Sequence, residues 1–187
     1  MKTLVIIVLS VVAFLVLLLG VAAAIGSRLP VAHSATRSIV VRKSSEEIYQ
    51  LIRDVGSAST WRPDVKSVEL LGSPGGKLNY REHGSQGDVT YEIVEEVANE
   101  RMVTRIVDQN LPFGGRWEYD IEPDGPDASR VTITERGWVS NPIFRFVSRF
   151  VMGHTATIDA YLRALGKHFG SEPTPTLIAT TGASDGV

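Results

Sequence analysis

Cysteine is absent from all 187 residues, so the chain can form neither a disulfide nor a cysteine-ligated metal site. The four histidines lack metal-ligand spacing, and no H-E-x-x-H or G-x-G-x-x-G pattern occurs. We therefore expect neither a metal nor a dinucleotide cofactor. Blocks of charge are also missing. The 19 basic and 21 acidic side chains are mixed along the chain, which gives no indication of nucleic-acid binding.

The first notable stretch is the uncharged apolar run from Leu4 to Gly26. It matches the roughly 20 residues needed to cross a bilayer and exceeds the roughly 7–15 of a signal-peptide core. Its length favours a retained single-pass membrane helix over a secretory signal cleaved near Ala24. Basic residues after the run favour a cytoplasmic domain. Two of them, Arg42 and Lys43, belong to the folded domain, so the side of the membrane stays open.

We expect three parts in the chain. Residues 1–35 form a membrane anchor and linker, residues 36–170 form one folded domain, and residues 171–187 form a disordered tail. The tail is rich in Ser, Thr, Pro and Gly and shows no periodic pattern.

The folded part is predicted to begin with an alternating strand at residues 36–43, followed by a helix in "SSEEIYQLIRDVG". Ser44 and Glu47 have the spacing of a capping box, and Gly56 ends the helix. Six strand-like runs follow, separated by short turns. Because parallel neighbours need long crossovers, these short connections predict an antiparallel meander.

The last element is predicted to be one long helix from Pro142 to about Gly170, with Asn141 as its N-cap. Its apolar side chains share one stripe: Val147, Phe150, Val151, Ile158, Tyr161, Leu162, Leu165 and Phe169. His154 falls in the middle of this stripe. An imidazole aimed at the core suggests that the helix covers a partly open cavity. Gly153 is the point where the helix can bend or break.

This order of elements, with "WRPDVKSVELL", "LPFGGRWEYDIEP" and "VTITERGWVSNPIFRFV", resembles the SRPBCC superfamily. That group includes START lipid-binding domains, polyketide cyclases and birch-pollen-allergen-like proteins, and the chain is most similar to a bacterial, single-pass membrane-anchored branch. The resemblance covers residues 36–170. It implies an α+β helix-grip fold, in which a seven-stranded curved antiparallel sheet wraps around the long C-terminal helix. It implies no particular activity, since the superfamily mixes transfer proteins, binders and cyclases.

Strand alternation predicts which side chains face the cavity. Apolar walls with a few placed polar groups are typical of small-molecule sites. We predict that a ligand contacts Tyr80, Glu82, Tyr91, Trp117, Tyr119, Glu135, His154 and Ile158. One strand stays ambiguous, because "RMVTRIVD" could turn either Val103 and Arg105 or Met102 and Thr104 inward.

Each of these residues also has a structural interpretation. The aromatic side chains could fill the core, and an inward glutamate could be a rim residue or half of a salt bridge. His154 could meet Glu135 and lock the helix in place, or touch a ligand. Leu111 and Phe113, next to two glycines, would form an apolar flap over the cavity mouth.

Three functions follow, of which the first is favoured and the other two are equally supported. The first is a membrane-tethered module that binds or transports a hydrophobic or amphipathic small molecule, such as a lipid, isoprenoid or polyketide-like compound. The second is a cyclase-type enzyme that uses Glu135, Glu82 and His154 as general acid and base. The third is a structural or interaction domain whose cavity is packed shut.

Overall fold

A computed structural model of the chain describes residues 1–85, 87–153 and 155–177. Its elements follow in the order α1 (Lys2–Ser27), β1 (Ala32–Val41), α2 (Ser45–Arg53), η1 (Val55–Thr60), β2 (Val65–Gly72), η2 (Pro74–Gly76), β3 (Asn79–Gly84), β4 (Gly87–Val97), β5 (Arg101–Ile106), β6 (Phe113–Pro123), β7 (Ser129–Val139), α3 (Pro142–Val147), η3 (Ser148–Met152), α4 (Ala156–His168) and β8 (Thr176–Leu177).

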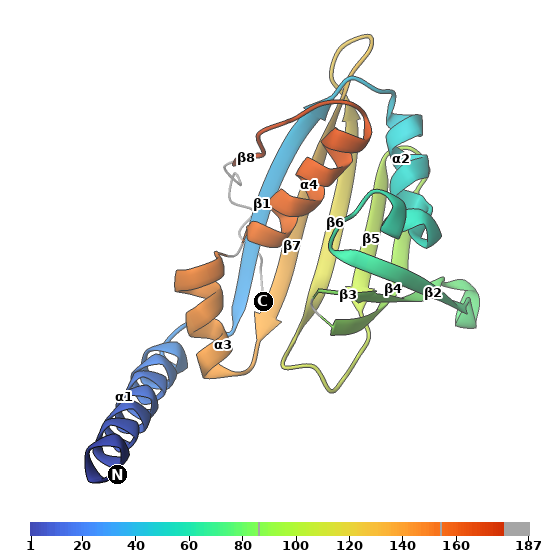
Figure 1. Cartoon of the computed structure of the whole chain (residues 1–187). Helices are drawn as coiled ribbons and strands as arrows, with labels where there is room; N and C mark the ends of the chain where they lie inside the picture. Colours follow the sequence, from blue (N-terminus) through green and yellow to red (C-terminus); the bar gives the residue numbers. More distant parts are fainter. Residues whose placement is uncertain (86, 154, 178–187) are drawn as a thin grey trace.

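The strands of the described residues form one antiparallel sheet in the order β2-β3-β4-β5-β6-β7-β1-β8. Figure 1 shows this sheet curving around the C-terminal helix, which confirms the α+β helix-grip fold. The meander from β2 to β7 is also confirmed, since each of these strands pairs with the next one in sequence.

Two strand details differ from the sequence prediction. The first strand begins at Ala32 rather than at residue 36, because its pairing with β7 continues through Ala32 opposite Trp138. The sheet has an eighth strand, β8, which pairs Thr176 with Ser38 and lies within the stretch expected to be a disordered tail. An edge strand offers unpaired backbone groups, and an extended segment can pair with them whatever its side chains are.

Local sequence accounts for where two helices begin. The Ser44 hydroxyl accepts a hydrogen bond from the Glu47 backbone N–H at 3.2 Å, and Glu47 accepts one from the Ser44 backbone N–H. The predicted capping box is therefore confirmed. Asn141 caps α3 in the predicted way, with its side-chain oxygen accepting from the N–H groups of Ile143 and Phe144.

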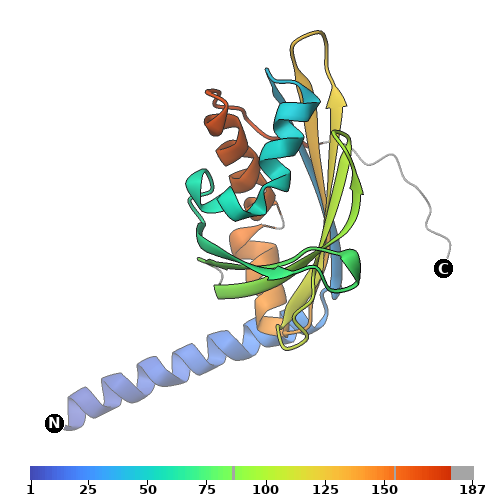
Figure 2. The same ribbon diagram turned by 90° about the vertical axis from the view of Figure 1, so that its right-hand side faces the viewer.

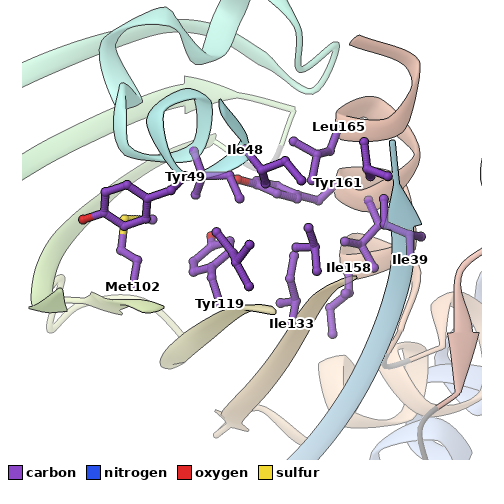
Figure 3. Close-up of a cluster of buried hydrophobic side chains, with 14 of the residues drawn as sticks. Ile39, Ile48, Tyr49, Met102, Tyr119, Ile133, Ile158, Tyr161 and Leu165 are labelled. Carbon is purple, nitrogen blue, oxygen red and sulfur yellow. The ribbon is translucent and has the colours of Figure 1, made fainter. Parts of the chain in front are cut away.

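The core lies between the concave face of the sheet and two helices, α4 and α2 (Figure 3). From α4, Ile158, Leu162 and Leu165 are fully buried. They belong to one cluster with residues of β1 and β7 such as Ile39 and Ile133. Side chains three or four residues apart on α4 thus meet alternate side chains on the strands, which is the packing that both periodicities predict.

The predicted single long helix is interrupted. Gly153 has φ +78° and separates η3 from α4. This left-handed conformation costs little only for glycine, so Gly153 breaks the helix where the sequence allowed it. The apolar stripe is broken with it: Ile158 and Leu165 are buried in the core, whereas Phe150 and Val151 are 58% and 72% exposed.

Helix α1 contains one segment, Lys2–Gly26, that is long and apolar enough to cross a membrane. Its last turn packs on the start of α3. A Cβ placed on Gly26 would lie 1.8 Å from the Pro142 carbonyl oxygen, so only glycine permits this approach. Figure 2 shows α1 leaving the domain beside α3.

Candidate functional site

A cavity of about 120 Å³ lies on the concave side of the sheet, next to the start of α4. Strands β3 to β7 form most of its wall, and the segment after η1 contributes one edge. The lining residues are Arg62, Asp64, Val65, Tyr80, Glu82, Gly84, Ser85, Gly87, Val89, Tyr91, Thr104, Ile106, Phe113, Gly114, Gly115, Arg116, Trp117, Tyr119, Glu135 and Thr157.

The structure brings together most of the residues that the sequence placed in the cavity. Six of the eight line it: Tyr80, Glu82, Tyr91, Trp117, Tyr119 and Glu135. Ile158 is fully buried in the core and is not part of the cavity wall. His154 lies outside the described residues, so its predicted contact with Glu135 remains a prediction.

The structure also settles the ambiguous strand. Thr104 and Ile106 of β5 line the cavity, and Met102 lies in the core. Arg105 points outward instead, with 57% of its side chain exposed and a 2.7 Å contact to Glu92. Of the predicted flap, Phe113 lines the cavity and Leu111 does not.

An ion pair that the sequence analysis missed forms the polar centre of the cavity. Arg62 donates to both carboxylate oxygens of Glu82, at 2.6 and 3.1 Å, and to Asp64 at 2.7 Å. The Arg62 and Glu82 side chains are only 13% and 11% exposed. Burial by itself disfavours the charged guanidinium, but the Glu82 carboxylate and Asp64 raise the pKa of Arg62 above its ordinary value.

Nothing in the local pattern marked Arg62 as an inward residue. It lies in an irregular segment between η1 and β2, where no strand alternation assigns a face. The one available indication was chemical, since an inward Glu82 needs a cationic or hydrogen-bonding partner to be stable in an apolar site.

Aromatic rings surround this ion pair. The Arg62 guanidinium lies 5.0 Å from the ring centroid of Tyr161, and the Trp61 and Tyr161 rings meet edge to face at 5.2 Å. Tyr80 and Tyr91 stack at 5.4 Å on the neighbouring strands. The cation and the rings thus stabilise each other where both are largely buried.

Four tyrosines of this cluster remain protonated at neutral pH: Tyr80, Tyr91, Tyr119 and Tyr161. Burial raises the pKa of each phenol above the ordinary tyrosine value, and the negative charge of Glu82 adds to the effect. Their hydroxyl groups are therefore hydrogen-bond donors and not phenolate bases.

A second polar pair lies at another part of the wall. The Glu135 carboxylate on β7 lies 3.2 Å from Nε2 of His33 on β1, and both side chains are largely buried. Glu135 lines the cavity together with Thr157 from the first turn of α4. Across residues 1–85, 87–153 and 155–177, no group of three or more His, Asp or Glu side chains is arranged to hold a metal ion.

The site combines aromatic and aliphatic walls, neutral hydroxyl donors, one fixed cation and a carboxylate–imidazole pair. This arrangement can enclose a molecule with apolar rings or chains and orient its oxygen atoms. Both Glu82 oxygens already accept hydrogen bonds from Arg62. Glu135 is therefore the better placed of the two glutamates to exchange a proton with a ligand.

Comparison with known proteins places this geometry in a family context. A family model described as polyketide cyclase/dehydrase and lipid transport matches residues 32–169. No curated relative matches the chain.

Solved structures share the fold at low identity. A START superfamily protein from Mycobacterium smegmatis is 18% identical, with a TM-score of 0.61 over 74% of this chain and 97% of that protein. The Zhui aromatase/cyclase from Streptomyces sp. R1128 is 11% identical, with a TM-score of 0.60 over 74% and 94% of the two chains. Norcoclaurine synthase from Thalictrum flavum is 13% identical, with a TM-score of 0.59 over 74% and 94%.

Proposed function

We propose that this chain, which belongs to the polyketide cyclase/dehydrase and lipid transport family, binds a small amphipathic molecule between its sheet and α4. The observation that carries the proposal is the Arg62–Glu82 pair inside an aromatic cavity. A domain whose only task was to pack its core would gain little from burying two charges. A ligand-binding wall, in contrast, needs a few fixed polar groups.

The wall chemistry narrows the class of ligand. Arg62 and the tyrosine hydroxyls donate hydrogen bonds, so the ligand should carry carbonyl, hydroxyl or carboxylate oxygens. Trp117, Tyr91 and Phe113 supply ring faces for an apolar body. The cavity, about 120 Å³, is smaller than the roughly 300–1,000 Å³ of typical ligand sites, which favours a compact ring compound or a single chain over a two-chain lipid.

The proposal includes a membrane tether. We propose that α1 is retained as a single-pass membrane helix, which would concentrate lipid-soluble molecules beside the cavity. Strands β3 and β4, whose Gly84 and Gly87 line the cavity, extend toward the side of the domain from which α1 leaves (Figure 2). A ligand leaving the bilayer would therefore approach the glycine-rich edge of the cavity.

The test is to identify what the full-length protein carries. The chain is purified from membranes in a mild detergent, and its bound small molecules are extracted and analysed by mass spectrometry. In the variant Thr157→Trp, an indole placed on the cavity wall competes with the ligand for space. The matched control is Ala160→Trp, which adds the same indole to the exposed face of the same helix.

We expect wild type and Ala160→Trp to carry the same compound and Thr157→Trp to lose most of it while its circular dichroism spectrum is unchanged. Binding in the cavity is refuted if Thr157→Trp retains as much compound as the control. It is also refuted if no compound accompanies the wild-type protein.

One observation supports an enzymatic alternative. Glu135 lines the cavity, and its partner His33 lies beside it. In this geometry an imidazole can position a carboxylate for proton transfer. Glu135→Gln keeps the size of the side chain and removes the exchangeable carboxylate. A cyclase-type enzyme would accumulate unreacted substrate in this variant, so its bound compound would differ from that of the wild type. A binding protein would carry the same compound in both.

A further inference from the structure

A second surface of the molecule remains after the cavity is explained. We call it the α3–η3 surface and define it by Phe144, Arg145, Arg149, Phe150 and Val151. Three of its side chains are large, apolar and exposed: Phe144 by 50%, Phe150 by 58% and Val151 by 72%. Because Gly153 breaks the helix, Phe150 and Val151 are turned away from the core that Ile158 and Leu165 of the same stripe occupy.

Exposed apolar side chains in such a cluster indicate a binding surface. The position of the cluster on the molecule indicates what kind of partner binds there. Gly26 in the last turn of α1 packs directly on Pro142, the first residue of α3. Arg145 donates to the Leu29 carbonyl at 3.0 Å and so ties α3 to the segment that follows α1. Figures 1 and 2 both show α3 beside the carboxyl end of α1.

The two segments that meet at this junction carry charge of one sign. Neither residues 1–45 nor residues 136–158 contain an Asp or a Glu. The two nearest carboxylates in the sequence are already paired, Glu135 with His33 and Asp159 with Arg37. The arginines of the α3–η3 surface therefore face the junction without a carboxylate from these segments.

Both of these arginines line a groove. It has a volume of about 380 Å³, and its wall consists of residues 29–34, Val139, Arg145 and Arg149. The Nε atom of Arg145 is buried and makes no hydrogen bond to any of the described residues. A buried guanidinium nitrogen without a partner favours an anionic oxygen as its ligand.

We propose that the α3–η3 surface docks on an anionic phospholipid bilayer, with Phe144, Phe150 and Val151 inserted among the lipids and Arg145 and Arg149 against headgroup phosphates. The apolar side chains and the arginines lie on one short segment at the end of a helix that is itself apolar enough to cross a membrane. This combination is typical of interfacial segments, which add apolar burial to attraction by anionic lipids.

Docking has a consequence for the cavity. Helix α3 and α1 would hold the domain at two points, so the domain could not swing freely on its linker. The β3–β4 edge of the cavity would then stay close to the lipid headgroups. The inference rests on the membrane tether of the proposed function and goes beyond it, because a tether alone leaves the α3–η3 surface in water.

The absence of cysteine allows a direct test on the full-length protein. Single cysteines at Val151, at Leu15 within α1, and at the exposed Arg163 on α4 are labelled with a polarity-sensitive fluorophore. The protein is reconstituted into nanodiscs of phosphatidylcholine alone or with phosphatidylglycerol, and a quencher attached to the lipid chains reports membrane contact.

We expect strong quenching at Leu15 in both lipid mixtures, quenching at Val151 that increases with phosphatidylglycerol, and none at Arg163. Changing Arg145 and Arg149 to Gln should shift the Val151 equilibrium about 30-fold toward the undocked state, as expected for two charges near an anionic surface. Free inorganic phosphate at the same ionic strength as chloride should leave the quenching unchanged, which distinguishes a bilayer from a site for the free anion.

Quenching at Leu15 without quenching at Val151 would overturn the docking proposal and leave the tether standing. Quenching at neither position would overturn the tether, and the docking proposal with it. Displacement by free phosphate at constant ionic strength would show an anion site in place of a bilayer contact.

Discussion

Arg62 and Glu82 form a two-pronged ion pair inside the cavity wall, although they are 20 residues apart and Arg62 lies in an irregular segment whereas Glu82 lies on β3. Each partner is largely withdrawn from water, so each depends on the other for its charge to be stable. The pair therefore links the segment after η1 to β3 and fixes the polar centre of the cavity.

The first prediction concerns this pair. Arg62→Met should lower the free energy of unfolding by about 3–5 kcal/mol, because it leaves the Glu82 carboxylate buried without its partner. Thermal or urea unfolding measures the loss. Arg62→Met combined with Glu82→Leu should recover much of it, since the Asp64 carboxylate, which also loses its Arg62 partner, is 35% exposed and can be hydrated.

The control for this prediction is an exposed ion pair on the same sheet. Arg105→Gln breaks the contact with Glu92, but the Arg105 side chain is 57% exposed. Surface pairs contribute roughly 0–1 kcal/mol, so this variant should unfold almost as the wild type does. Equal losses for Arg62→Met and Arg105→Gln would contradict the buried role of Arg62.

The second prediction concerns alkaline pH. The chain has five tyrosines, and burial raises the pKa of every one of them: Tyr49, Tyr80, Tyr91, Tyr119 and Tyr161. The folded state then keeps phenolic protons that the unfolded state has lost. Stability is unaffected below the ordinary tyrosine pKa of about 10 and falls as the pH rises above it.

Phenolate absorbance measures this directly. In the folded protein we expect little ionisation near pH 10 and then a steep rise that coincides with the loss of circular dichroism. The protein in concentrated urea serves as the control and should titrate as free tyrosine does. Gradual ionisation of several tyrosines near the ordinary value, with the fold intact, would show that the aromatic cluster is open to water.

The third prediction concerns Gly115 on β6, which lines the cavity. It has φ +150°, and a Cβ there would lie 2.5 Å from the Arg136 backbone oxygen on β7. Gly115→Ala should therefore destabilise the protein by about 1–3 kcal/mol, since the backbone must move to relieve the clash. Urea unfolding of the purified variant gives the value.

Gly56→Ala is the matched control for Gly115→Ala. A Cβ on Gly56 would meet only the Asp54 side chain, at an ordinary distance of 3.7 Å. This variant should be at least as stable as the wild type, because alanine restricts the unfolded chain more than glycine does. If Gly115→Ala is also as stable as the wild type, the backbones of β6 and β7 are not in tight contact at Gly115.

The fourth prediction concerns the amino terminus. We predict that the mature protein keeps Leu4–Gly26, because the run is too long for a typical signal core. The intact mass of the protein extracted from membranes should correspond to the chain from Met1 or Lys2. A mature protein that begins near Ile25 and stays in the soluble fraction would show that the segment is a cleaved signal.

The sequence by itself determined the elements whose cause is local. Ser44 and Glu47 specify where α2 begins, Asn141 specifies where α3 begins, and the short turns specify an antiparallel meander. Strand alternation also predicted six residues of the cavity wall, because successive side chains on a strand must point to opposite faces. These inferences need only neighbours in the chain.

Tertiary structure decided the features that local sequence patterns did not predict. Alternation could not place Arg62, which lies between regular elements and finds Glu82 only after the sheet has folded. Periodicity alone assigned Phe150 and Val151 to the core, whereas the left-handed conformation of Gly153 turns them outward. Contacts between residues far apart in the chain decide which side chains meet across a cavity and which stay exposed. Local patterns do not encode these contacts.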